Sequence, residues 1–128
     1  MIRKHALKET GMDIAEYNAA WLRAWSDKDT AKLLTFYHRE TVYKDGQVPA
    51  GLTGHTALGA YLDNLFKMTP PMEYVPDEVW PIPGGFCGRW ICTISLPDGS
   101  QRKMRGFDLV LLDGDQITLN EVYTHNLP

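Results

Sequence analysis

The chain has few cysteines, no long apolar run and no excess of basic residues, and each shortage excludes a class of protein. Its two cysteines, Cys87 and Cys92, point to opposite faces of one expected strand and cannot bridge each other there. The longest apolar runs, such as 109–112, fall far below the roughly 20 residues that a membrane span needs. A net charge of −3 offers no surplus of Lys and Arg for phosphate backbones. We therefore expect no nucleic-acid partner, no membrane insertion and a cytoplasmic protein with reduced thiols.

Metal-ligand spacing is also missing, because the four histidines are scattered and none forms a zinc-type pair with a cysteine. We expect no metal site. What the chain does have is an average globular mixture, with 44% hydrophobic and 23% charged residues over 128 positions. This predicts a single domain over 12–128, after a flexible polar segment over 1–11 that lacks the apolar core of a signal peptide.

Helical spacing of apolar residues comes first in the chain, and strands follow. The pattern predicts helices over 13–25, 30–37 and 55–68, the last ended by Pro70-Pro71. Strands are expected over 41–45, 72–82, 85–96, 101–113 and 115–125, with turns at 97–99 and 113–115. Helices segregated ahead of an antiparallel meander predict an α+β fold in which helices cover one face of a curved sheet. The space between them is the expected pocket for an uncharged or weakly charged small molecule.

Asp108 is the most informative residue, because it stands in a largely apolar row of the strand 101–113. Desolvation there raises the pKa of a carboxyl group, and a protonated acid in a dry pocket can donate a hydrogen bond to a developing oxyanion. The alternative is a structural ion pair with Arg89 on the neighbouring strand. Arg89 could instead bind a carboxylate of the ligand.

Asp45 is the second candidate, at the exit of the strand 41–45. A carboxylate held at a strand end and opening onto a loop is well placed to act as a general base. The alternative is a plain turn residue, because Asp-Gly is a common turn pair.

Aromatic and histidine side chains supply the remaining candidates. Tyr17, Trp21 and Trp25 form a stripe on the first helix, which core packing alone would explain, although Trp21 could also line the pocket floor. On the last strand, Tyr123 and His125 share one face with Glu121; a single bulge decides whether that face meets the pocket. His125 suits acid–base work near neutral pH, or else it is a solvated strand end.

The outer face of the sheet is expected to be apolar as well. Phe86, Trp90 and Phe107 are assigned to it. An apolar outer face on a soluble protein needs a covering partner, so we predict a homodimer through the sheet.

At this point the sequence resembles a known group of proteins. The resemblance lies in Trp-Ser-Asp-Lys-Asp at 25–29, Phe-Tyr at 36–37, Thr-Val-Tyr-Lys-Asp at 41–45, Gly-His-Thr-Ala-Leu at 54–58 and the closing hairpin 106–117. Their spacing is similar to that of the nuclear transport factor 2-like superfamily, and most similar to its SnoaL-like polyketide cyclase branch. The resemblance covers about residues 12 to 126. It implies a cone of three helices on a strongly curved, mainly antiparallel sheet around one internal pocket.

The resemblance also implies roles for single residues. Laid on the pattern of the related ketosteroid isomerases, Asp45 falls on the proton-shuttling base and Asp108 on the acid that hydrogen-bonds the oxyanion. Trp21 falls on a helix tyrosine of that pattern, and an indole N–H is a donor but no substitute for a phenol. The pattern of the limonene epoxide hydrolases fits poorly, since its aspartates fall on Ile91 and His125; only Tyr43 and Asp45 resemble its water-positioning pair. The epoxide-opening triad is therefore absent.

Three functions follow from these observations. The first is cofactor-independent proton transfer on an apolar carbonyl compound, as an isomerase or aldol-type cyclase, with Asp45 as base and Asp108 as acid. Trp21, Tyr17, Tyr43, Arg89, Tyr123 and His125 are the expected substrate-binding residues. The second is a module that binds a small apolar molecule without chemistry, and the third is an interaction domain that acts through its sheet.

Overall fold

The helices form where apolar residues recur at helical spacing, and two of them begin at an aspartate that caps the first turn. The computed structural model describes residues 12–128, in which α2 spans Ile14–Ser26, α3 spans Thr30–Phe36 and α4 spans His55–Met68. Asp13 caps α2, since its carboxylate accepts from the backbone N–H groups of Ala15 and Glu16 at 3.0 and 3.1 Å. Asp29 caps α3 in the same way through the backbone N–H of Lys32.

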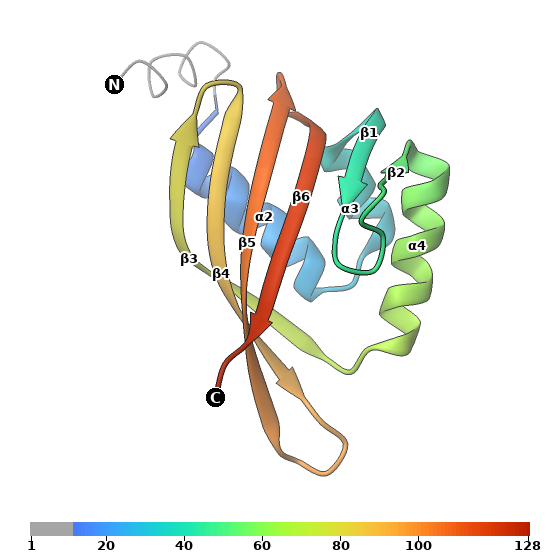
Figure 1. Ribbon diagram of the computed structural model, residues 1–128, viewed down its shortest axis with the longest axis vertical. Helices are drawn as coiled ribbons and strands as arrows, with labels where there is room; N and C mark the ends of the chain where they lie inside the picture. The colour runs from blue at the N-terminus through green and yellow to red at the C-terminus, as the bar shows by residue number, and fades with distance from the viewer. Residues whose placement is uncertain (1–11) are drawn as a thin grey trace.

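One curved sheet fills the rest of the described chain. Its strands are β1 Tyr37–Lys44, β2 Leu52–Thr53, β3 Met72–Ile82, β4 Gly85–Ser95, β5 Gln101–Asp113 and β6 Gln116–Asn126. They lie in the order β2-β1-β6-β5-β4-β3, and every neighbouring pair is antiparallel except β1 with β6. In Figure 1, α2 crosses behind the sheet and α4 lies beyond the β1 side. The predicted α+β fold, with helices on one face of a mainly antiparallel sheet, is confirmed.

Two details of the first half differ from prediction. Tyr37 was expected to end a helix over 30–37, but it begins β1 with extended backbone angles of φ −98° and ψ 137°. The extended form lets its hydroxyl donate to Oδ1 of Asn120 on β6 at 2.8 Å, deep in the core. The short strand β2 was not predicted. The segment over 1–11, expected to be flexible, lies outside the described residues.

Register decides which residues face the helices. Across β4 and β5, Gly88 pairs with Asp108 and Trp90 pairs with Gly106, and directly opposite residues share one face of a sheet. Phe86 and Trp90 are therefore on the helix side, with exposed fractions of 0% and 4%. Their assignment to the outer face was wrong. Phe107 does lie on the outer face, where 40% of it is exposed.

The register between β5 and β6 likewise shows which residues of the last strand face the helices. Asp108 pairs with Val122, so Asn120, Val122 and Thr124 point toward the helices. Tyr123, opposite Phe107, points outward together with the neighbouring alternate residues of β6.

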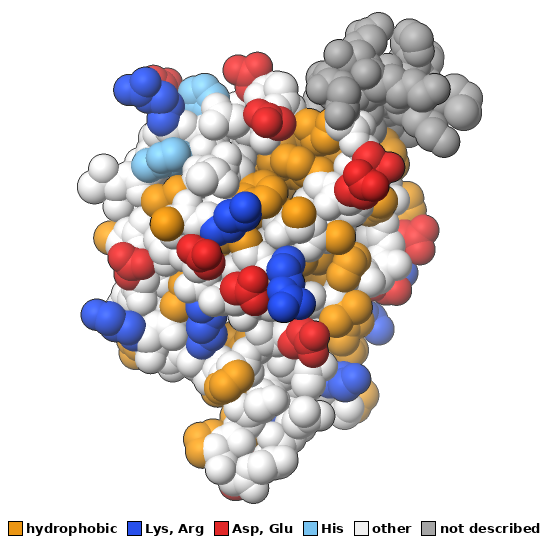
Figure 2. Space-filling view, turned by 180° about the vertical axis from the view of Figure 1, so that it is seen from behind, with side chains coloured by type: hydrophobic (Ala, Val, Ile, Leu, Met, Phe, Trp, Pro, Cys, Tyr) orange, Lys and Arg blue, Asp and Glu red, His pale blue; other side chains and the backbone are white. Residues whose placement is uncertain are grey.

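The molecular surface carries mixed charge. Figure 2, the view from behind, shows acidic and basic side chains interspersed among hydrophobic ones. No helix within residues 12–128 is long and apolar enough to cross a membrane. In the same residues, no group of three or more His, Cys, Asp or Glu could hold a metal ion.

Candidate functional site

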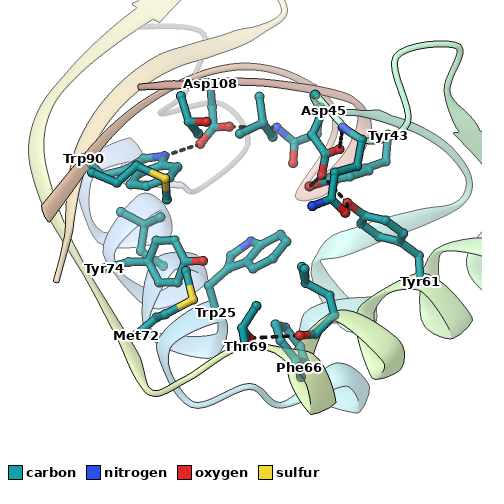
Figure 3. A pocket seen from close by; sticks show the side chains of 18 of the residues that line it. Trp25, Tyr43, Asp45, Tyr61, Phe66, Thr69, Met72, Tyr74, Trp90 and Asp108 are labelled. Carbon is teal, nitrogen blue, oxygen red and sulfur yellow. Dashed lines mark hydrogen bonds between the residues drawn. The ribbon is translucent and has the colours of Figure 1, made fainter. Parts of the chain in front are cut away.

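A cavity of about 270 Å³ lies between the helices and the inner face of the sheet. This volume is near the lower end of the roughly 300–1,000 Å³ usual for ligand pockets, so it suits a compact molecule. Seven of its twenty lining residues are aromatic, and most of these are labelled in Figure 3. The aromatic side chains that line it are Trp21, Trp25, Tyr43, Tyr61, Phe66, Tyr74 and Trp90.

Asp108 on β5 belongs to the cavity wall and is 2% exposed. The indole N–H of Trp90 donates to its Oδ2 at 2.7 Å, and the amide of Asn120 donates to its Oδ1 at a longer 3.4 Å. Both partners are uncharged. Burial raises the pKa of the Asp108 carboxyl from 3.8 to about 7, although these two hydrogen bonds oppose the rise. Asp108 is thus about half protonated at neutral pH and largely protonated about one pH unit below it.

The predicted alternative, an ion pair between Asp108 and Arg89, is wrong. Arg89 pairs with Phe107 in the register of the sheet, which turns its side chain to the outer face. There its Nε contacts Oδ2 of Asp77 at 2.6 Å, and its guanidinium lies 5.3 Å from the ring centroid of Trp80.

Gly106 explains why the Trp90 indole can reach Asp108. The ring of Trp90 lies against the backbone of Gly106, directly opposite on β5. A β-carbon at position 106 would stand 2.0 to 2.3 Å from three indole atoms. Only glycine at position 106 leaves room for the Trp90 ring. In this place the ring directs its N–H to the carboxyl of Asp108, two residues further along β5.

Asn120 links Asp108 by hydrogen bonds to Tyr37 in the core. Its Oδ1 accepts from the Tyr37 hydroxyl at 2.8 Å, while its amide nitrogen faces Oδ1 of Asp108. Asn120 and Tyr37 are both fully buried. The hydroxyl of Tyr37 therefore holds the amide in the orientation that donates toward Asp108.

Asp45 follows β1 and lines another part of the same cavity (Figure 3). Its Oδ2 accepts from the hydroxyls of Tyr43 at 2.7 Å and Tyr61 at 2.6 Å. Its Oδ1 accepts from the backbone N–H groups of Gln47 at 2.8 Å and Val48 at 3.2 Å. An ionised carboxylate has about four acceptor positions, so this one is fully occupied. From the sequence, a turn residue and a residue facing the ligand were alternatives for Asp45. In the structure Asp45 is both, because it holds the turn and lines the cavity.

Asp45 and Asp108 line the same cavity, and one strand, β6, separates β1 from β5. Lys44, the last residue of β1, pairs with Glu121 on β6, and the next residue of β6, Val122, pairs with Asp108. Asp45 directly follows Lys44, so a continuation of this register puts the α-carbons of Asp45 and Asp108 two strand spacings apart, about 10 Å. Val122 lines the cavity between them. A compact molecule lying over Val122 can meet both carboxyl groups.

Two further polar groups border the cavity. The indole N–H of Trp21 is buried and has no hydrogen-bond partner among residues 12–128. Lys28 donates to the backbone oxygens of Phe66 and Thr69 at 3.2 and 2.6 Å and to Oγ1 of Thr69 at 2.9 Å. Its ammonium hydrogens are therefore all used to hold the end of α4.

The structure brings four of the eight predicted site residues to this cavity, namely Asp45, Asp108, Trp21 and Tyr43. The other four are not among its lining residues. Tyr17 donates to the backbone oxygen of Asp115 at 2.8 Å, at the far end of α2, and Arg89 is on the outer face. Tyr123 and His125 are exposed on the outer side of β6, because Val122 and Thr124 take the inner side.

Three residues of the site were missed in the sequence. Trp90 was placed on the wrong face, and neither Tyr61 nor Asn120 was among the candidates from the sequence. The signal for Trp90 was available: a hairpin centred on 97–99 pairs position 90 with 106, on the face of Asp108. No local signal joins Tyr61 to Asp45, since their contact depends on how α4 packs beside β1.

Comparison with known proteins gives one family. The profile of the SnoaL-like domain matches residues 18–120. No curated protein sequence matches the chain. Several solved structures are similar in fold, and three illustrate their range.

A protein of ketosteroid isomerase-like fold from Catenulispora acidiphila, in complex with trimethylamine, has a TM-score of 0.76 at 16% identity, with 87% of this chain and 86% of that one covered. A proposed polyketide cyclase from Acidithiobacillus ferrooxidans has a TM-score of 0.74 at 18% identity, with coverage of 88% and 91%. A Mycobacterium tuberculosis protein in complex with estradiol-17β-hemisuccinate has a TM-score of 0.69 at 15% identity, with coverage of 85% and 91%. Identities this low describe the fold alone.

Proposed function

This chain belongs to the SnoaL-like domain family, within the nuclear transport factor 2-like superfamily, and on that premise we propose that it catalyses proton transfer on a small, apolar carbonyl compound without a cofactor. The reaction is an isomerisation or an aldol-type ring closure. The observation that carries the proposal is the buried Asp108, whose raised pKa of about 7 makes it a hydrogen-bond donor in the wall of the cavity that Asp45 also lines.

In this mechanism the carbonyl oxygen of the substrate accepts a hydrogen bond from the protonated Asp108. The Asp45 carboxylate then takes a proton from the carbon next to the carbonyl group, and the negative charge that develops on oxygen is shared with Asp108. An isomerase returns the proton to another carbon. A cyclase lets the enolate carbon attack a second carbonyl group of the same molecule, and that new oxyanion takes the proton back from Asp45.

Trp90 prepares Asp108 for this role. Because Oδ2 accepts the short hydrogen bond from the indole N–H, and Oδ1 accepts only the 3.4 Å one from Asn120, the acidic hydrogen of Asp108 belongs on Oδ1. The acid is then held in one orientation before the substrate arrives, so no reorganisation is needed during the reaction.

Hydrogen–deuterium exchange tests the proposal with a simple two-ring ketone, 2-tetralone. In D2O, we expect the protein to speed the exchange of the α-hydrogens above the buffer rate. Asp45→Asn removes the base and is expected to abolish the acceleration, whereas Asp108→Asn keeps an N–H donor and is expected to keep part of it. Equal rates for the wild type and Asp45→Asn would exclude the mechanism.

Binding of a small molecule without chemistry is the second candidate, and one observation favours it: all four acceptor positions of Asp45 are occupied. Two structures of similar fold hold small ligands, trimethylamine in one and a steroid ester in the other. Tight binding of a ketone with no exchange of its α-hydrogens would select this candidate.

We also propose that residues 12–128 act as one domain and dimerise through the outer face of the sheet, in the cytoplasm where Cys87 and Cys92 stay reduced. Large side chains exposed on that face support a covering partner: Trp80 at 39%, Phe107 at 40% and Tyr123 at 61%. Light scattering after gel filtration tests this, because Phe107→Asp should convert a dimer into a monomer. A monomeric wild type would contradict the dimer, and the exposed face of the sheet would then be a surface for another partner.

A further inference from the structure

The proposed reaction meets an obstacle at the base. Asp45 has to accept a proton from the substrate, yet both of its oxygens are already saturated with donors. One of the four donors must leave before a lone pair becomes available. The packing around each of the four donors indicates which one can leave.

Three of the four donors are held in place. The N–H groups of Gln47 and Val48 belong to the backbone of the turn after β1, which also carries the bond from Val48 N to Asp45 O. Tyr43 is a residue of β1 with 2% of its surface exposed, and its ring is stacked on Trp25 at a centroid distance of 6.3 Å. Moving any of them would disturb the strand or the turn.

Tyr61 differs in two respects. It lies on α4 and is partly exposed, and its ring is tilted against that of Tyr43 at a centroid distance of 5.7 Å rather than stacked. Its hydroxyl also has a second acceptor within reach, because Oε1 of Gln47 is 3.5 Å away while Oδ2 of Asp45 is 2.6 Å away. A small movement exchanges one hydrogen bond for the other.

We infer that Tyr61 is a positioning residue that switches between two acceptors, covering the base when its hydroxyl donates to Asp45 and freeing it when the hydroxyl donates to Gln47. The inference rests on the proposed proton transfer. The covered state keeps the carboxylate ordered and satisfied in the empty cavity. The open state leaves one lone pair of Oδ2 facing the substrate, and the Gln47 amide oxygen compensates the displaced hydroxyl.

The two partners of the switch have opposite effects on the rate. Tyr61→Phe removes the covering hydroxyl and keeps the ring, so the base is always open. The hydrogen bond to the charged Asp45 no longer has to be broken before the reaction, so kcat should rise about tenfold. Gln47→Ala removes only the receiving amide, since the backbone N–H to Asp45 remains, and is expected to lower kcat by a few-fold. KM should change little in either variant.

A double-mutant cycle in the 2-tetralone exchange assay tests this. The Gln47→Ala effect should vanish in a Tyr61→Phe background, where no hydroxyl at position 61 needs an acceptor. Tyr17→Phe is the matched control, because it removes a phenolic hydroxyl that bonds to Asp115 away from the cavity, and its rate should equal the wild-type rate.

The outcomes separate the two proposals. Opposite signs for Tyr61→Phe and Gln47→Ala, with the loss of the Gln47→Ala effect in the double variant, support the switch. Rates that fall in both single variants, or effects that simply add, overturn the switch and leave the proton-transfer function standing. No exchange above buffer in the wild type and in Tyr61→Phe overturns both.

Discussion

Replacing Asp108 by Asn should change how the stability of the protein depends on pH. In the unfolded chain this carboxyl ionises near its ordinary pKa of 3.8, whereas burial holds it protonated up to about 7 in the folded protein. A difference of about three pKa units corresponds to about 4 kcal/mol. Because the folded state keeps this proton to a higher pH, the contribution of Asp108 to stability is full below about pH 4 and is lost as the pH rises to about 7.

Urea denaturation followed by tryptophan fluorescence measures the effect. The free energy of unfolding of the wild type, minus that of Asp108→Asn, should fall by about 3 kcal/mol between about pH 5 and pH 8. Other titrating groups are common to both proteins and cancel in this difference. Asn keeps the size of the side chain and an oxygen for the Trp90 N–H. Its N–H₂ group loses the 3.4 Å hydrogen bond from Asn120, a cost that does not vary with pH and leaves the expected fall unchanged. A difference that stays flat over this range would show an ionised Asp108 and refute the reasoning.

Three further predictions concern the supports of the site. Gly106→Ala puts a β-carbon 2.0 Å from the Trp90 indole, so it should lower the free energy of unfolding by about 1–3 kcal/mol, whereas Gly46→Ala, with no atom within 4 Å, should stay within about 0.5 kcal/mol in the same urea assay. Trp90→Phe removes the donor to Asp108 and should raise the pKa of that carboxyl above about 7 in a carbon-13 NMR titration; a lower value would contradict the role of the indole. Asp13→Ala removes the cap of α2 and should destabilise the protein by about 1 kcal/mol, and an unchanged melting temperature would argue against the cap.

Much of the fold was predictable because its elements have strong local patterns. The strand over 101–113 was placed at its observed bounds, and the third helix was found over 55–68 because apolar spacing begins after Gly54 and ends before Pro70-Pro71. The start of β1 at Tyr37 was not predictable in the same way. Its extended form is stabilised by a hydrogen bond to Asn120, which is 83 residues away in the chain.

The candidate site was predictable only in part, for a related reason. An aspartate in an apolar row, such as Asp108, is visible in a single strand. The partner of that aspartate is visible only through the register between two strands, and without the register Trp90 was assigned to the wrong face. The contact of Asp45 with Tyr61 depends on packing between a helix and a strand, for which local spacing gives no information.

The pH dependence of ketone exchange tests the central claim most directly, because it asks whether a protonated Asp108 and a carboxylate at Asp45 act on one molecule. With the buffer rate subtracted, exchange of the 2-tetralone α-hydrogens by the wild type should fall as the pH rises through about 7, where Asp108 loses its proton, and this fall should be missing in Asp108→Asn. A protein-dependent rate that climbs steadily through the same range, or one that has the same profile in both proteins, would contradict the account.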